Sequence, residues 1–377
     1  MSNTRDLNET PLHKNNNIVN EICTKGICME MCPSEEVILR VKEKMVHVLE
    51  LTRSGHKLVK CYCRSAANSN MAVPQLLRPF RVLSDTVHYL LLEISNRSNI
   101  KMSVMYDFLD DRLRAVRQDM TIQRLPPEEC VVLLEPMIRF YIYYGYRLCD
   151  HPISEFDPVL NKKYLLECMK WFLNCCDVLQ NTDKVEDDVD TILTHFNSLD
   201  ISKTRPELSC DRILVESLYI LCNLDSIHPL YRYLCLPNYL KRVSALKLAY
   251  NIAIANMKCN FIKIFKLSRK LCPLTFSALC LHHPMIQRRA LQAMSFAYNS
   301  QHLTVPVEVL KQWLAFNSYE EARSTCMHYG LKVVKEKHGV CFNKHTFKVD
   351  VEQHQLTKYY QAKILQLKLE DVLSYTV

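Results

Sequence analysis

Glycine is scarce in this sequence. Only five glycines occur among the 377 residues, at positions 26, 55, 145, 330 and 339. A loop that wraps a phosphate group needs closely spaced glycines, because its backbone adopts φ values that other residues rarely reach. Turn-rich β folds need glycine for the same reason. The sequence therefore argues against phosphate-loop nucleotide-binding folds and predicts helices joined by short polar connections.

The net charge of +8 suits an acidic partner, either protein or nucleic acid, and equally suits a mildly basic solvated surface. No apolar segment stands near the beginning of the sequence, and the most apolar run, 131–146, is interrupted by Glu135, Pro136 and Arg139. We therefore expect an intracellular, reducing environment and no membrane association, so the 18 cysteines are not expected to form disulfides. Most should be small buried side chains on helices, including Cys168, Cys175, Cys222, Cys259 and Cys280.

Composition divides the chain into four predicted parts. A disordered tail is expected at 1–20, a helical-repeat domain at 21–300, a smaller unit at 301–350 and a C-terminal tail at 351–377 that forms either helix or strand. Within the large domain, the acidic and polar stretch 181–209 contains the run DKVEDDVD and is the best candidate for a linker.

Apolar residues recur at steps of three and four along most of the chain, as amphipathic helices require. The helix that begins after Pro33 is expected to bury Val37, Val41, Met45 and Val48. A second apolar stripe, through 104–121, consists of Tyr106, Leu109, Leu113, Val116 and Met120. Further helices are predicted at 128–149, 158–180, 210–224, 228–235, 238–256, 259–270, 273–281 and 285–299.

These later helices come in pairs of similar length. In the helix at 238–256 the predicted buried face consists of Val243, Leu246, Tyr250, Ala253, Ile254 and Met257. One amphipathic hairpin cannot bury its apolar face alone, so consecutive pairs must stack. We predict a mostly α fold, a solenoid of stacked helical hairpins.

The region after residue 300 has a different pattern. Helices are predicted at Val307–Phe316 and at Tyr319–Tyr329, the second ending at Gly330. Short strands are predicted at Leu331–Val334, Val340–Phe342 and Thr346–Val349. Two helices followed by a small β-hairpin is the order of a winged helix, so we predict a winged helix at 301–350.

This predicted winged helix is rich in cations. Its candidate partner or nucleic-acid surface consists of Lys311, Arg323, Lys332, Lys335, Lys337, Lys344 and Lys348. Three uses are open: pairing with another protein, contact with nucleic acid shared with a partner, and autonomous nucleic-acid binding. Such domains at the ends of helical solenoids usually pair with another such domain, and we expect any nucleic-acid binding by the isolated chain to be weak and steeply salt-dependent.

Other candidate sites have simpler explanations. Cys23, Cys28 and Cys32, with Cys61 and Cys63, lack the C-x₂-C spacing of zinc sites, so we favour structural thiols over zinc. The run 149–151, Cys-Asp-His, has residue types of a thiol nucleophile site, but neighbours in sequence do not face one another on a helix. No metal site, cofactor or catalytic residue is predicted.

The helix at 104–121 also carries arginines. Arg112, Arg114, Arg117 and Arg124 alternate with Asp110, Asp111 and Asp119. Two interpretations are open: an internal belt of ion pairs between helix layers, which we favour, and an electrostatic docking surface.

Several motifs resemble those of one family. The segment Gly26, Ile27, Cys28, Met29, Glu30, Met31, Cys32, Pro33 resembles the opening G-x-C-x-x-M-C-P of the suppressor-of-actin (SAC)/GANP domain. The runs RSAA at 64–67 and RPFRVL at 78–83 are similar to its next stretches. Another match is to the family's Y-D-F…R-x-R-x-[IV]-R-x-D helix, which is similar to the residues Tyr106, Asp107, Phe108, Arg112, Arg114, Arg117 and Asp119. The runs FIKIFKL at 261–267 and RRALQAM at 288–294 resemble its last helices.

The resemblance implies a PCI-type scaffold of mRNA export with no enzymatic activity and no small-molecule substrate. It implies that a winged helix pairs with that of a second PCI protein, supported by a small acidic proteasome-lid-type protein. The joined winged helices would present a basic surface to RNA or single-stranded nucleic acid. The chain most resembles the short, single-domain members linked to centrosome duplication and the spindle. The nucleus, the cytoplasm and the centrosome are therefore the expected locations.

Overall fold

The fold is known from a computed structural model that describes residues 24–53, 55–64, 72–182, 211–300, 302–334, 338–352, 354 and 368–374. The predicted tail at 1–20 and nearly all of the predicted linker at 181–209 lie outside these residues. The described part is mostly helical with two small sheets, which confirms the predicted fold class. None of its helices is long and apolar enough to cross a bilayer.

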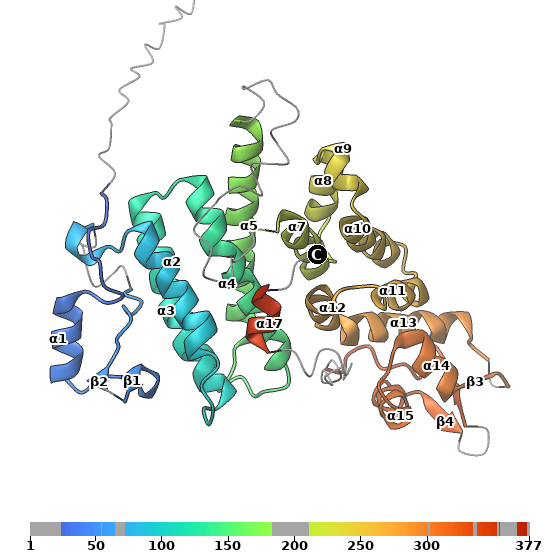
Figure 1. The fold of residues 1–377 in the computed structure, drawn as a ribbon. Helices are drawn as coiled ribbons and strands as arrows, with labels where there is room; N and C mark the ends of the chain where they lie inside the picture. Colours follow the sequence, from blue (N-terminus) through green and yellow to red (C-terminus); the bar gives the residue numbers. More distant parts are fainter. Residues whose placement is uncertain are drawn as a thin grey trace, which may run out of the picture.

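The first half of the molecule contains three long helices and several short elements (Figure 1). Its long helices are α3 (Met102–Gln123), α4 (Pro127–Arg147) and α5 (Pro158–Thr182). Its short elements are α1 (Ser34–Lys42), η1 (Val48–Glu50), β1 (Leu51–Thr52), β2 (Gly55–His56), η3 (Pro74–Leu76), α2 (Phe80–His88) and the π-helix η4 (Tyr89–Ile94).

The second half begins with shorter helices. These are α7 (Arg212–Cys222), α8 (His228–Cys235), α9 (Asn238–Arg242), α10 (Ser244–Met257), α11 (Phe261–Ser268), α12 (Pro273–Cys280) and α13 (His283–Ala297). Side-chain caps fix two of their starts: Asp211 accepts from the Leu214 N–H, and Asn260 from the Lys263 N–H. The helix predicted at 238–256 is broken in two, because Val243 adopts an extended conformation between α9 and α10.

One hydrophobic core runs through both halves. Helix α4 packs on α5, and α12 packs on both α4 and α7, so the helix pairs stack side by side along the molecule. The predicted apolar stripe of α3 is buried, which confirms that prediction. Met257 was predicted to face the core but is 56% exposed, because α10 ends at this residue.

A small mixed unit follows α13. We call it the C-terminal unit: β3 (Thr304–Pro306), α14 (Val307–Leu314), α15 (Tyr319–His328), β4 (Lys332–Val334) and β5 (Gly339–Cys341). Its three strands are antiparallel in the order β3-β5-β4. The prediction of a strand at Thr346–Val349 was wrong: the third strand is β3, which precedes the helices and pairs Val305 with Val340.

Helix α1 also differs from its prediction. Val41, Met45 and Val48 were expected to be buried, but each is at least 42% exposed. The helix ends at Lys42, and its only buried side chain is Arg40. Arg40 makes an ion pair with the buried Glu50, so α1 is held by a charge contact where an apolar face was predicted.

The segment 368–374 returns to the first half of the molecule. It was predicted to be part of a tail, but it contains α17 (Leu369–Ser374), which packs against α4 (Figure 1). Leu369, Val372 and Leu373 are buried there. The buried Arg139 of α4 donates 2.7 Å to the Val372 carbonyl and 2.5 Å to Glu135. A cation inside α4 is therefore satisfied partly by a residue far along the chain.

The raised pKa of the buried Glu135 carboxyl leads us to expect that the stability of the protein depends on pH. Burial raises its pKa to about 7 from an ordinary 4.5, although Arg139 acts in the opposite direction. Between these values the folded protein holds a proton that the unfolded chain has released, so the free energy of unfolding falls as pH rises. The free energy of unfolding of the wild type, relative to that of Glu135→Gln, should therefore fall by up to about 3 kcal/mol from about pH 5 to about pH 8. Urea unfolding across this range measures it, and a constant difference would contradict the assignment.

Candidate interaction surface

The residues of the recognised motifs converge on one buried carboxylate, Asp119 of α3. Its side chain is fully buried, and it accepts 2.7 Å from Arg78 Nε and 2.6 Å from Lys60 Nζ. Arg78 also donates 3.3 Å to the Met31 carbonyl. Two cations and one carboxylate thus join four segments, around residues 31, 60, 78 and 119. The first and last of these segments are about ninety residues apart in the sequence. This arrangement holds the N-terminal segment on α3.

Gly26 explains why the first motif contains glycine. A Cβ atom at this position would lie 2.3 Å from the Leu77 carbonyl oxygen and 2.7 Å from Gln123 Oε1. The absence of a side chain lets the Gly26 N–H donate 2.8 Å to Gln123 Oε1, and the next residues bond to the backbone of Pro74 and Leu77. The glycine is required for close packing against backbone.

A second buried carboxylate, Glu50, was not identified from the sequence. It accepts from the Val59 N–H at 3.0 Å and pairs with Arg40 and, at 3.3 Å, with Arg112. Burial by itself would raise the pKa of Glu50, but the Val59 hydrogen bond and the two arginines outweigh it and lower the pKa. Glu50 stands in a short 3₁₀ turn with no periodic pattern, so only its position beside α1 and α3 shows its role.

The arginines of α3 face inward. Arg114 stacks over Tyr62, 3.9 Å from the ring centre, and Arg117 pairs with Glu167 of α5 at 2.6 Å. Arg112 is buried against Glu50. These contacts support the interpretation of an internal belt between helix layers over that of a docking surface. Arg124 is the left-handed C-cap of α3.

The other motif residues also have structural positions. Pro33 and Pro79 are the N-caps of α1 and α2. Cys32, Tyr106 and Phe108 are buried, and the Tyr106 hydroxyl donates 3.1 Å to Asn161 Oδ1. Cys28 is half-buried and Asp107 is exposed. The described motif residues at 26–33, 78–83 and 106–119 therefore mainly build the fold of the first half.

Cys32 of the first motif and the nearby Cys61 behave as packing residues. Burial raises the pKa of Cys61 to about 12 and that of Cys32 further, so both thiols are protonated near neutral pH. The described cysteines form no disulfide, and among the described residues no three metal-ligating side chains form a cluster. Cys23 lies outside the described residues. Of the five cysteines expected to be buried, Cys259 is exposed, and the other four are buried.

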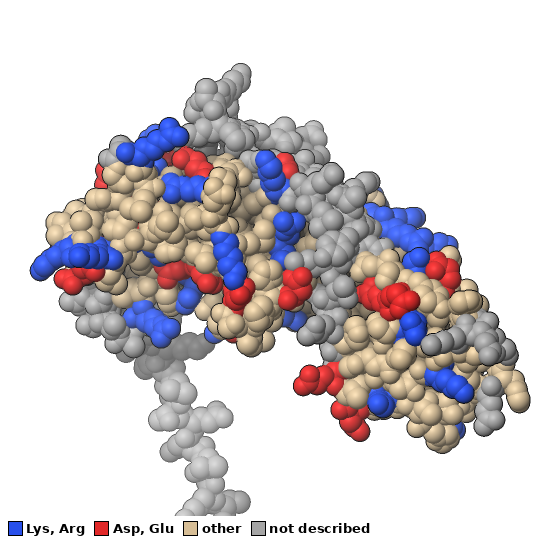
Figure 2. Space-filling view, turned by 90° about the horizontal axis from the view of Figure 1, so that it is seen from below, with Lys and Arg blue, Asp and Glu red and all other residues tan. Residues whose placement is uncertain are grey.

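The predicted basic surface of the C-terminal unit is weaker than its lysines suggested. Lys311 pairs with Glu308 and Arg323 with Glu320 within their own helices, at 3.0 and 3.1 Å. Lys332, Lys344 and Lys348 are exposed, whereas Lys335 and Lys337 lie outside the described residues. Residues 301–350 hold seven Lys and Arg against five Asp and Glu. Figure 2 accordingly shows positive and negative side chains close together over this end of the molecule.

Another positive surface, in the described part of the second half, was missed in the sequence analysis. Residues 226–300 contain 11 Lys and Arg and no Asp or Glu. Within this stretch, the exposed cations of the α10–α11 hairpin are Lys247, Lys258, Lys263, Lys266, Arg269 and Lys270, which we call the α10–α11 face. A count of charge by segment would have found it, whereas periodicity could not, because periodicity marks the buried side of a helix.

Comparison with known proteins identifies relatives over most of the chain. A family model described as the SAC3/GANP family matches residues 31–335. Protein xmas of Drosophila melanogaster is 26% identical over 361 residues, which cover 90% of this chain and 16% of that protein. SAC3 family protein B of Arabidopsis thaliana is 27% identical over 338 residues, covering 84% of this chain and 18% of that protein. SAC3 family protein 1 of Schizosaccharomyces pombe is 24% identical over 335 residues, covering 84% and 31%. The chain thus spans less than a third of each relative.

Proposed function

The chain belongs to the SAC3/GANP family, and on this basis we propose that it is a non-catalytic scaffold of an mRNA-export-like complex. In this proposal the C-terminal unit pairs with the corresponding unit of a second PCI-type protein. A small acidic protein of the proteasome-lid type supports that partner. Nucleic acid is contacted weakly, over a surface shared by the two paired units.

The arrangement of the C-terminal unit is the observation that carries this proposal. Its elements follow the order strand, helix, helix, strand, strand, and the first strand pairs with the last. A winged helix has this arrangement, and here it follows a stack of helix pairs, as in a PCI-type protein. Helix α11 packs on α14, so the unit is attached directly to the last helix pairs.

The surface of the C-terminal unit favours a protein partner over nucleic acid. Met327 of α15 is 54% exposed and Val349 is 51% exposed, close to the exposed Lys348. Exposed apolar side chains beside charges are typical of the rim and core of a protein interface. The near balance of charge over 301–350 gives little attraction for phosphates.

Charge reversal at two exposed lysines tests the pairing. We expect Lys332→Glu combined with Lys344→Glu to weaken association with a second PCI-type protein about 10-fold or more, because like charges placed in an interface cost several kcal/mol. The measurement is affinity purification of the tagged full chain, followed by quantitative mass spectrometry. Imaging of the same tagged protein through the cell cycle distinguishes a nuclear from a centrosomal setting.

The control makes the same change of charge elsewhere. Lys163 and Lys170 are exposed on α5, in the first half of the molecule, and their reversal should leave the partner bound. Recovery of no PCI-type protein and no small acidic subunit by the wild type would refute the proposal. Equal loss of partners from both double variants would show that the C-terminal unit is not the pairing surface.

A further inference from the structure

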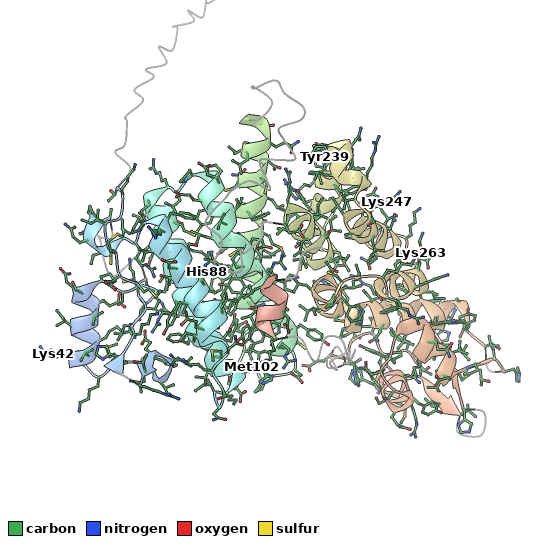
Figure 3. The ribbon with its side chains drawn as sticks, viewed as in Figure 1. Lys42, His88, Met102, Tyr239, Lys247 and Lys263 are labelled. Carbon is green, nitrogen blue, oxygen red and sulfur yellow. The ribbon has the colours of Figure 1, made fainter. Side chains whose placement is uncertain are left out.

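We propose that the α10–α11 face is a second docking site, which takes an acidic protein segment bearing aliphatic side chains. The solvent side of α11 is almost entirely cationic. Its exposed residues recur at helical steps and therefore share one side of the helix: Ile262, Lys263, Lys266, Arg269 and Lys270. Ile264, Phe265 and Ser268 occupy the opposite, buried side. Lys247 and Lys258 extend the face onto α10, and Figure 3 shows Lys247 and Lys263 along the same outer edge as Tyr239.

Within the part of the chain that the structure describes, no acidic side chain balances the cations of this face. No described carboxylate lies within 4.0 Å of a nitrogen of the six side chains. Other cations of the same acid-free stretch do find acids on neighbouring elements: Arg232 pairs with Asp177 and Glu216, and Arg289 with Asp225. The six exposed cations therefore repel one another, and an anionic partner relieves this repulsion.

Helix capping explains only part of the positive charge. Lys266, Arg269 and Lys270 stand at the C-terminal end of α11, where cations interact favourably with the helix dipole. Lys263 stands in the first turn of α11 and Lys247 in the first turn of α10, where the helix end is itself positive. Neither position helps its own helix. Attraction of an external anion accounts for both.

Apolar side chains among the cations favour a protein over a nucleic acid. Ile262 is 47% exposed beside Lys263, and Met257 is 56% exposed beside Lys258. Leu234 and Tyr239, on the adjoining α8 and α9, are 59% and 55% exposed. Phosphates would neutralise the cations but would leave the aliphatic side chains without an apolar counterpart. An acidic segment with interleaved leucines contacts both.

Binding of synthetic peptides to the full chain tests this inference. One labelled peptide of about 20 residues alternates acidic residues with leucine, and a second replaces every leucine with serine at the same charge. We expect the leucine peptide to bind at least about 10-fold more tightly in fluorescence anisotropy. Lys263→Glu with Lys266→Glu should weaken it at least about 10-fold, whereas the matched control Lys163→Glu with Lys170→Glu should not.

The aliphatic contact is tested separately by Ile262→Ser. This exposed substitution should weaken the leucine peptide severalfold and leave binding of a labelled oligouridine unchanged, with an unaltered thermal melting curve as the check on folding. The proposal is overturned if neither peptide binds saturably or if the serine peptide binds equally well. It is also overturned if oligouridine displaces the labelled leucine peptide at a lower concentration than the unlabelled leucine peptide does. The last result assigns the face to nucleic acid. Because Lys332→Glu with Lys344→Glu should leave peptide binding intact, failure here is distinct from failure of the proposed pairing.

Discussion

Replacing Asp119 with alanine should lower the free energy of unfolding by about 3–5 kcal/mol, because two buried cations lose their shared carboxylate. Arg78 is fully buried and Lys60 is 8% exposed. Each would keep one carbonyl acceptor, that of Met31 or Leu76, which cannot balance its charge. The N-terminal segment is held on α3 by these contacts, so its protection from hydrogen exchange should fall as well.

Urea unfolding measures the effect, and the same helix supplies the control. Asp107 is exposed on α3, so Asp107→Ala should change stability by less than about 0.5 kcal/mol. Asp119→Asn keeps one acceptor and should be intermediate, which provides a measurable variant if the alanine protein does not fold. A loss below about 1 kcal/mol in Asp119→Ala would show that the cations reach water or another acceptor.

Gly330→Ala should destabilise the C-terminal unit by about 3 kcal/mol or more, for two reasons that add. Gly330 ends α15 at a φ of +80°, where a residue with a Cβ atom is strained. That Cβ atom would also lie 2.3 Å from the Thr346 carbonyl oxygen, so the backbone would have to move. Thermal unfolding of the full chain and hydrogen exchange in α15 measure the loss.

Ala315 provides a control of opposite sign within the same unit. It ends α14 at a φ of 53°, the left-handed conformation that glycine adopts without strain. Ala315→Gly should therefore be neutral or stabilise the unit by up to about 1 kcal/mol, although glycine also increases the entropy of the unfolded chain. If both substitutions destabilise equally, backbone conformation is not the cause.

Local patterns were sufficient to predict most of the helices. The stripe of α3, the start of α15 at Tyr319 and the end of that helix before Gly330 agree with the structure, because each depends on residues within a few positions. Helix α1 was predicted with the wrong buried side, because an ion pair between Arg40 and Glu50 determines its contact. Strand β3 was missed because three residues ending in proline give no alternation to detect.

The candidate sites depend on contacts between distant residues, which spacing cannot supply. Arg78 and Asp119 both belong to recognised motifs, but nothing in the sequence shows that they touch across 41 positions. Lys60 belongs to none of the recognised motifs, and its role appears only with its 2.6 Å contact to Asp119. The α10–α11 face lies in a stretch of sequence without acids, at 226–300. The basic surface was instead predicted on the winged helix at 301–350, where positive and negative residues nearly balance.

The return of α17 to α4 has a consequence for the order in which the protein can form during its synthesis. Arg139 emerges from the ribosome 233 residues before the Val372 carbonyl that it binds. Until then the guanidinium in the middle of α4 lacks this acceptor, and the apolar side chains of α4 that pack against α17 remain uncovered on that side. The packing of α4 is therefore completed only when synthesis has passed residue 373, although α12 of the second half covers it earlier.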